Sequence, residues 1–178
     1  MPVINFEDPQ YLLKGTAKQV LAHKTLAELR IFDLLNEYDP VLAGTIPIGI
    51  DIEGSDLDIL CCFSSAIKFE IDLKLFFAKQ EKFRVRKLWM DGIETVIASF
   101  KTNHFPVEIF GQETPVVQQA GYLHLINEYG LLIKYGEDFR RKIIDLKLAG
   151  WKTEPAFAKL LGLSGDPYQA MLKIAHPL

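Results

Sequence analysis

Apolar and polar positions follow two different periods along the chain, and the change between them separates helices from strands. Residues 9–38 carry apolar side chains at helical spacing, and Gly15-Thr16 divides a short first helix from a longer second one with Thr16 as its N-cap. From Val41 the period becomes two, which predicts strands over 41–43, 56–63, 83–90, 94–100 and 106–110. A helix is expected over 66–80, and Asp91-Gly92 is a good hairpin turn between two of the strands.

After Gly111 the period returns to that of helices. Helices are expected over 115–129, 135–149, 153–162 and 167–175, with Thr153 as the N-cap of the third. This order of elements predicts an α+β fold, in which a small mixed β-sheet flanked by helices is followed by a helical C-terminal extension. We place the core at residues 1–112 and the extension, packed on it within one compact unit, at residues 113–178.

The residues best suited to catalysis or metal binding lie around the second expected strand. Asp56 and Asp58 are two residues apart, so both carboxylates project from one face of the strand, about 7 Å apart at the backbone. Asp-x-Asp on a strand usually forms a solvated face, and an isolated Gly-Thr such as Gly44-Thr45 is usually a turn. Here the other face of the strand is apolar, aspartate is depleted in strands, and a third acid, Glu108, lies between apolar neighbours in a later strand.

Three carboxylates that converge would repel one another. Two unit charges 4 Å apart interact by about 4 kcal/mol at an effective dielectric constant near 20. A divalent cation removes this repulsion, and oxygen ligands are those that Mg²⁺ and Mn²⁺ prefer. Such a site can hold phosphate oxygens for an in-line displacement. A glycine followed by a hydroxyl residue offers donors to phosphate at close approach, so the pattern predicts phosphate chemistry assisted by a metal.

These motifs resemble the signature of the nucleotidyltransferase superfamily, which includes DNA polymerase beta and kanamycin nucleotidyltransferase. The signature reads Gly-[Ser/Thr], three residues, Gly, five residues and Ser-Asp-h-Asp-h, where h is apolar. It is matched here by Gly44, Thr45, Gly49 and the run 55–59, and Glu108 matches the third acid. The amino-acid sequence around these motifs also resembles that of an uncharacterised bacterial branch of the superfamily.

The resemblance implies a site and a reaction. Asp56 and Asp58 would bind metal, and Glu108 would bind one metal and activate an acceptor hydroxyl. The residues implied in holding the nucleotide are Gly44, Thr45, Gly49 and Ser55. The implied cofactor is Mg²⁺ or Mn²⁺, the donor is a nucleoside triphosphate (NTP), and the acceptor is an unidentified small molecule, protein or RNA.

The glycine loop departs from the family at one point. A basic residue often found before the second glycine is replaced by the apolar residues Ile46 and Ile48, so positive charge for a triphosphate has to come from elsewhere. Arg84 and Arg86 share one face of a hairpin strand and are candidates for binding phosphate together, the alternative being a solvated hairpin face.

Two functions are therefore weighed. The first is a Mg²⁺-dependent nucleotidyltransferase. The second is a non-catalytic module of the same fold that binds a nucleotide or a partner, such as an antitoxin-like regulator. The missing basic residue and the short chain favour the second, and convergence of the three carboxylates within metal-bridging distance would favour the first.

Composition and net charge further narrow the class of protein to which the chain can belong. The chain has 49% apolar and 24% charged residues and a net charge of −3, which fits a soluble globular protein and excludes a generic basic surface for DNA. There is no apolar run long enough for a membrane span and no signal-peptide pattern, so we expect a cytoplasmic protein. The adjacent pair Cys61-Cys62 and four scattered histidines argue against a zinc site, and His124 is expected to be partly exposed on a helix, with a place in the cleft as the alternative.

Overall fold

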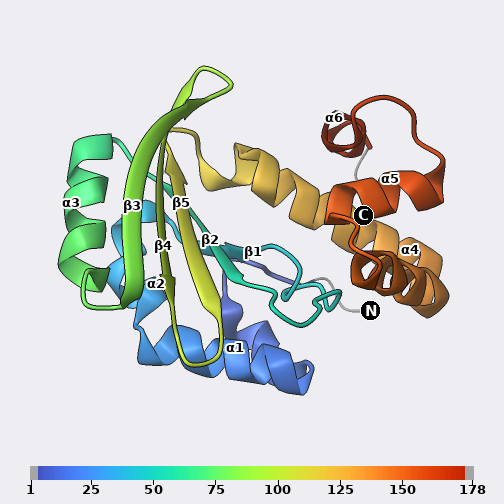
Figure 1. Cartoon of the computed structure of the whole chain (residues 1–178), viewed down its shortest axis with the longest axis horizontal. Coiled ribbons are helices and arrows are strands. Elements are labelled where there is room, and N and C mark those ends of the chain that lie inside the picture. Colours follow the sequence, from blue (N-terminus) through green and yellow to red (C-terminus); the bar gives the residue numbers. More distant parts are fainter. Residues whose placement is uncertain (1–3, 175–178) are drawn as a thin grey trace.

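A computed structural model describes residues 4–174, and its strands form one five-stranded mixed sheet (Figure 1). The strand order is β1-β2-β5-β4-β3, in which β2 and β5 run parallel and every other pair is antiparallel. The strands are β1 (Val41–Ala43), β2 (Leu57–Cys62), β3 (Glu81–Met90), β4 (Ile93–Lys101) and β5 (Pro106–Gln112). The α+β class and the mixed sheet are confirmed. The expected end of the last helix, at residue 175, lies outside the described residues.

Helices cover both faces of this sheet. They are η1 (Pro9–Lys14), α1 (Ala17–Glu28), α2 (Ile31–Leu34), η2 (Asn36–Tyr38), α3 (Ala66–Phe77), η3 (Val116–Gln118), α4 (Ala120–Leu148), α5 (Thr153–Leu161) and α6 (Pro167–Leu172). Figure 1 shows α3 on one side of the sheet and α4 to α6 on the other. None of the helices in the described part of the chain is long and apolar enough to cross a membrane.

The N-terminal helical region is more broken than its pattern indicates. Thr16 caps α1 as expected, in a capping box with Gln19. Arg30 then adopts a left-handed backbone with φ of 53° and separates α1 from α2. Apolar spacing continues across this point, and arginine is not a residue that marks left-handed backbone, so the break has no signal in the sequence.

The two helices predicted over 115–129 and 135–149 lie within α4. They are separated by a kink at Gly136 (φ 74°, ψ −165°), and the first of them begins at Ala120, after the short helix η3. This backbone conformation is essentially restricted to glycine. Thr153 is the first residue of α5 and not its N-cap, which is Lys152 without a side-chain hydrogen bond, so that prediction is wrong.

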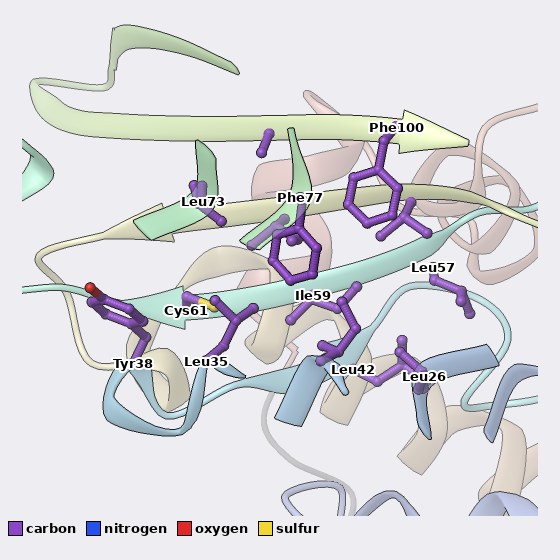
Figure 2. Close-up of a cluster of buried hydrophobic side chains, with 14 of the residues drawn as sticks. Leu26, Leu35, Tyr38, Leu42, Leu57, Ile59, Cys61, Leu73, Phe77 and Phe100 are labelled. Carbon is purple, nitrogen blue, oxygen red and sulfur yellow. The ribbon is translucent and has the colours of Figure 1, made fainter. Parts of the chain in front are cut away.

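Alternation along β2 builds two cores, one on each face of the sheet. Leu57, Ile59 and Cys61 are fully buried among side chains from α1, α2 and α3. In this core the rings of Phe77 and Phe100 stack with centroids 5.3 Å apart (Figure 2). Leu60 belongs to the second core, with α4, α5 and α6. Each fully buried side chain of this size contributes about 1.5–3 kcal/mol, so β2 is held from both sides.

Candidate active site

A cavity of about 630 Å³ lies between the second face of the sheet and the C-terminal helices. Its walls come from β1, β2 and β5, from the loop 44–56, from α4 and from the junction of α4 with α5. Its size is that of a site for a small ligand. The helical extension therefore forms one wall of the cavity. The sequence alone did not show that the extension contributes to the site.

The three acids of the motif, which we call the acidic trio (Asp56, Asp58 and Glu108), all line this cavity. Asp58 and Glu108 are direct neighbours in register on the parallel strands β2 and β5, so their side chains lie on the same face. Asp56 is exposed and precedes β2, whose first residue is Leu57, so the predicted start of this strand is one residue too early.

The structure brings the acidic trio to one wall without bringing all three carboxylates into tight contact. Among the described residues 4–174, one group of three acidic or imidazole side chains has ligand atoms that all lie within 4.8 Å of one another. That group lies on α4 and α5 and does not include the acidic trio. The acids of the trio nevertheless influence one another. Burial, followed by the charges of Asp56, Glu108 and Glu154, raises the pKa of Asp58 to about 7, against an effect of Lys147 that lowers it.

Glu108 is perturbed in the same direction. Its half-burial and the charge of Asp56 raise the pKa of its carboxyl, and Arg86 opposes this shift. Both residues therefore carry negative charge that the described protein atoms compensate only in part. Two neighbouring, partly buried carboxylates whose pKa values are raised are a favourable place for a cation.

The close approach of the Asp58 carboxylate to the backbone requires glycine at position 44. Its φ is +75°, and a Cβ atom at this position would lie 2.2 Å from Oδ2 of Asp58. Glycine therefore allows the carboxylate to lie directly against the backbone at the end of β1. The Thr45 hydroxyl donates to Oγ of Ser55 at 3.5 Å, and Oγ of Ser55 accepts from the N–H of Ile52 at 2.9 Å. Thr45 and Ser55 both line the cavity, as Gly44 does.

The loop that follows is held by side chains from two helices. Gln19 of α1 donates to two loop carbonyls at 2.9 and 3.0 Å, and Lys18 forms an ion pair with Asp51 at 3.1 Å. Arg140 of α4 donates to two further carbonyls, and that of Gly49 lies at 3.1 Å. Gly49 has φ of +67° and lies outside the cavity lining, so the structure places it in the loop turn and not beside the other predicted nucleotide-binding residues.

Arg84 and Arg86 also lie away from the cavity lining. Arg84 pairs with Ser99 of β4, which in turn pairs with Glu108, so the arginines are on the face of the acidic trio but at the sheet edge. Both are exposed. The basic side chains that line the cavity are instead Lys147 and Lys152. Lys147 is only 7% exposed, and burial lowers its pKa.

The prediction that His124 is partly exposed on a helix is wrong. His124 is buried and lines the cavity, which was the alternative position considered for it. Near it are Glu128, one helical turn later, and Glu154, from the first turn of α5. The spacing of His124 and Glu128 was visible in the sequence, but nothing local indicated Glu154 or Lys147, because α5 and the end of α4 reach this place only through the tertiary fold.

Solved structures of nucleotidyltransferases share this fold. Cid1 poly(U) polymerase with MgGTP bound matches with a TM-score of 0.54 at 13% identity, over 78% of this chain and 46% of that chain. The same polymerase with its short product ApU matches with a TM-score of 0.53 at 15% identity, over 92% and 52%. A cytoplasmic RNA terminal U-transferase matches with a TM-score of 0.51 at 16% identity, over 74% and 41%. This chain thus spans about half the length of these proteins, and the likeness establishes a nucleotidyltransferase-like fold.

At the level of sequence, no curated protein matches this chain. A family model does match, over residues 24–174, and these residues include the glycine loop, the acidic trio and the cavity-lining part of the helical extension. The match covers most of the chain. The protein therefore belongs to the family described as "Domain of unknown function (DUF4269)".

Proposed function

We propose that this protein is a nucleotidyltransferase that uses a divalent cation to transfer a nucleotidyl group from an NTP to an acceptor hydroxyl or phosphate. The observation that carries the proposal is the direct register of Asp58 with Glu108 on neighbouring parallel strands, facing a cavity that Gly44 and Thr45 also line. The nucleotidyltransferase-like fold supports the same conclusion, since Cid1 poly(U) polymerase is described with MgGTP bound.

The donor set of the acidic trio fits Mg²⁺ or Mn²⁺. All of its ligand atoms are carboxylate oxygens, and the pKa of Asp58 is raised by burial and then by the neighbouring acids, both of which a bound cation would offset. When bound, the cation would neutralise charge on the phosphates and on the departing pyrophosphate. Asp56, Asp58 and Glu108 are the residues that would hold it.

The remaining residues have separate tasks in this proposal. Gly44, Thr45 and Ser55 offer backbone N–H and hydroxyl groups to the triphosphate, and Lys147 and Lys152 supply the positive charge that the glycine loop lacks. For a hydroxyl acceptor, its oxygen bonds to the α-phosphorus, the bond from this phosphorus to the bridging oxygen of the β-phosphate breaks, and pyrophosphate leaves. The hydroxyl proton passes to Glu108, whose raised pKa makes it a better proton acceptor.

Thermal unfolding with each NTP, in the presence and absence of Mg²⁺, tests the proposal on the wild type and on Asp58→Asn. A ligand at 100 times its Kd stabilises by about 2.7 kcal/mol, which for a domain of this size raises Tm by roughly 5–10 °C. We expect a Mg²⁺-dependent shift in the wild type that is lost in Asp58→Asn and kept in Asp33→Asn, an exposed carboxylate on α2.

Two results would contradict this assignment. If Asp58→Asn binds Mg²⁺-NTP as well as the wild type does, the acidic trio does not hold the cation. If the wild type shows no shift with any nucleotide, the non-catalytic module becomes the better description, in agreement with the wider spacing of the acidic trio and the apolar side chains of Ile46 and Ile48 in the loop. If the wild type shows the shift, a screen of acceptors with labelled NTP then tests transfer itself.

A further inference from the structure

A second group of ligand-type side chains lies in the same cavity, on its helical wall. His124 and Glu128 are one turn apart on α4 and therefore share a face of the helix. Glu154 reaches them from the first turn of α5. One ligand atom of each residue lies within 4.8 Å of the corresponding atoms of the other two. We call these three residues the helical cluster.

The histidine of the helical cluster has a donor atom without a partner. His124 is only 9% exposed, and its Nδ1 is buried with no hydrogen-bond partner. The ring of Tyr168 on α6 packs edge-on against the imidazole, with centroids 6.4 Å apart, and this contact restricts the ring. A buried polar atom left unpaired destabilises a protein by about 1–3 kcal/mol, so a ligand that bonds to this imidazole would be favoured.

The charge of the cavity points in the same direction. Six acidic side chains line it against two lysines, and the six are Glu53, Asp56, Asp58, Glu108, Glu128 and Glu154. Glu128 is buried, and this burial, together with the charge of Glu154, raises its pKa well above the usual range despite the opposing charge of Lys147. Burial and the neighbouring acid therefore disfavour the ionised form of Glu128, and a dication bound beside it would compensate that charge.

We propose that His124, Glu128 and Glu154 form a second metal site, which binds a first-row transition dication such as Zn²⁺ or Mn²⁺. One imidazole nitrogen and two carboxylate oxygens are a ligand set that suits these ions and leaves positions for water or substrate. Mg²⁺ prefers oxygen ligands alone, so it is a poor ion for this set. The two sites of the cavity therefore differ toward Mg²⁺, which suits the acidic trio and not the helical cluster.

The location of the site indicates what the ion does there. It connects α4 with the beginning of α5, and the residues between these helices form the rim of the cavity. Figure 1 shows α5 beside α4 in this region, away from the main sheet. An ion bound by both helices would cross-link them and hold the rim in place. Its binding would not depend on the acidic trio or on nucleotide.

Calorimetric titration of the whole chain with ZnCl₂, MnCl₂ or MgCl₂, without nucleotide, tests the site. We expect one Zn²⁺ per chain, tighter binding of Zn²⁺ than of Mn²⁺, and no binding of Mg²⁺ that depends on the helical cluster. Glu154→Gln and His124→Asn should each weaken Zn²⁺ binding at least tenfold. In the wild type, saturating Zn²⁺ should also raise Tm, and Glu154→Gln, in which the half-buried side chain keeps its shape, should lose that rise.

Matched controls separate this site from others. Glu137→Gln changes an exposed carboxylate on the same helix, Cys62→Ser removes the half-exposed thiol, and Asp58→Asn alters the acidic trio, so all three should keep the Zn²⁺ site. The proposal is overturned if the wild type binds no Zn²⁺, or if both cluster variants bind Zn²⁺ like the wild type. Loss of the Zn²⁺ site in Asp58→Asn would likewise overturn it, whereas failure of nucleotide binding would leave this result unaffected.

Discussion

Replacing Gly44 by alanine tests how the loop positions the acidic trio, because it adds a single methyl group at the end of β1. The added Cβ would lie 2.2 Å from Oδ2 and 3.2 Å from Cγ of Asp58. The backbone φ of +75° is also a conformation that alanine rarely adopts. The substitution therefore strains the backbone and displaces the carboxylate of Asp58.

The size of the effect follows from these two contributions. A left-handed backbone costs an L-residue about 1–2 kcal/mol. Moving the carboxylate by rotation away from its preferred rotamer adds about 0.5–1.5 kcal/mol. The free energy of unfolding of Gly44→Ala should thus fall by about 1.5–3.5 kcal/mol, which for a chain of this length lowers Tm by roughly 3–14 °C.

Thermal unfolding of three variants separates the two contributions. Gly162 has φ of +67° with no atom within 4 Å of an added Cβ, so Gly162→Ala reports the backbone strain alone. In an Asp58→Ala background the contact disappears, and Gly44→Ala should then lower Tm by about as much as Gly162→Ala does. We further expect Gly44→Ala, but not Gly162→Ala, to reduce the Tm rise with Mg²⁺ and NTP. An effect of Gly44→Ala that is the same with and without the Asp58 carboxylate would refute this reasoning.

Two other substitutions test the electrostatics and the loop. The pKa of Asp58 is raised from 3.8 to about 7, so the folded chain binds a proton more tightly than the unfolded one, and stability falls as the pH rises from about 4 to about 7. With divalent cations chelated, Asp58→Asn should therefore unfold at a higher temperature than the wild type at pH 8, and this difference should narrow toward pH 4; a difference that does not change with pH would contradict the shift. Arg140→Met removes charged hydrogen bonds to two loop carbonyls and should lower the free energy of unfolding by about 1.5–3 kcal/mol in urea titrations. Arg141→Met, at an exposed position one residue later, should change it by less than about 0.5 kcal/mol, and equal effects of the two would argue against the anchoring of the loop.

Local patterns predicted the elements that carry the acidic trio. The alternation of β2, with Leu57 and Ile59 on one face and Asp58 and Leu60 on the other, is reproduced by the two buried clusters. The Asp91-Gly92 turn joins β3 and β4 as expected, with positive φ at both residues. These features depend on neighbouring residues, and the sequence displays them directly.

Other features depended on contacts between distant residues. The break at Arg30 has no local marker, and the position of Arg84 and Arg86 at the sheet edge follows from the strand order. The burial of His124 and Lys147 results from α4 passing over the sheet and from α5 packing back against α4. None of these could be derived from periodicity, which reports only which face of an element is apolar.

The sequence by itself determined the class of fold, the two faces of β2 and the residues of the acidic trio, because the spacing of polar and apolar side chains along one element decides these. Only the tertiary structure decided that Asp58 and Glu108 lie in direct register, that Gly44 lies against the carboxylate of Asp58, and that the helical extension adds Lys147 and the helical cluster to the same cavity. The physical reason is that pairing between strands and packing between helices are set by the burial of apolar surface across the whole chain, and this burial brings together residues as far apart as Gly44 and Glu154.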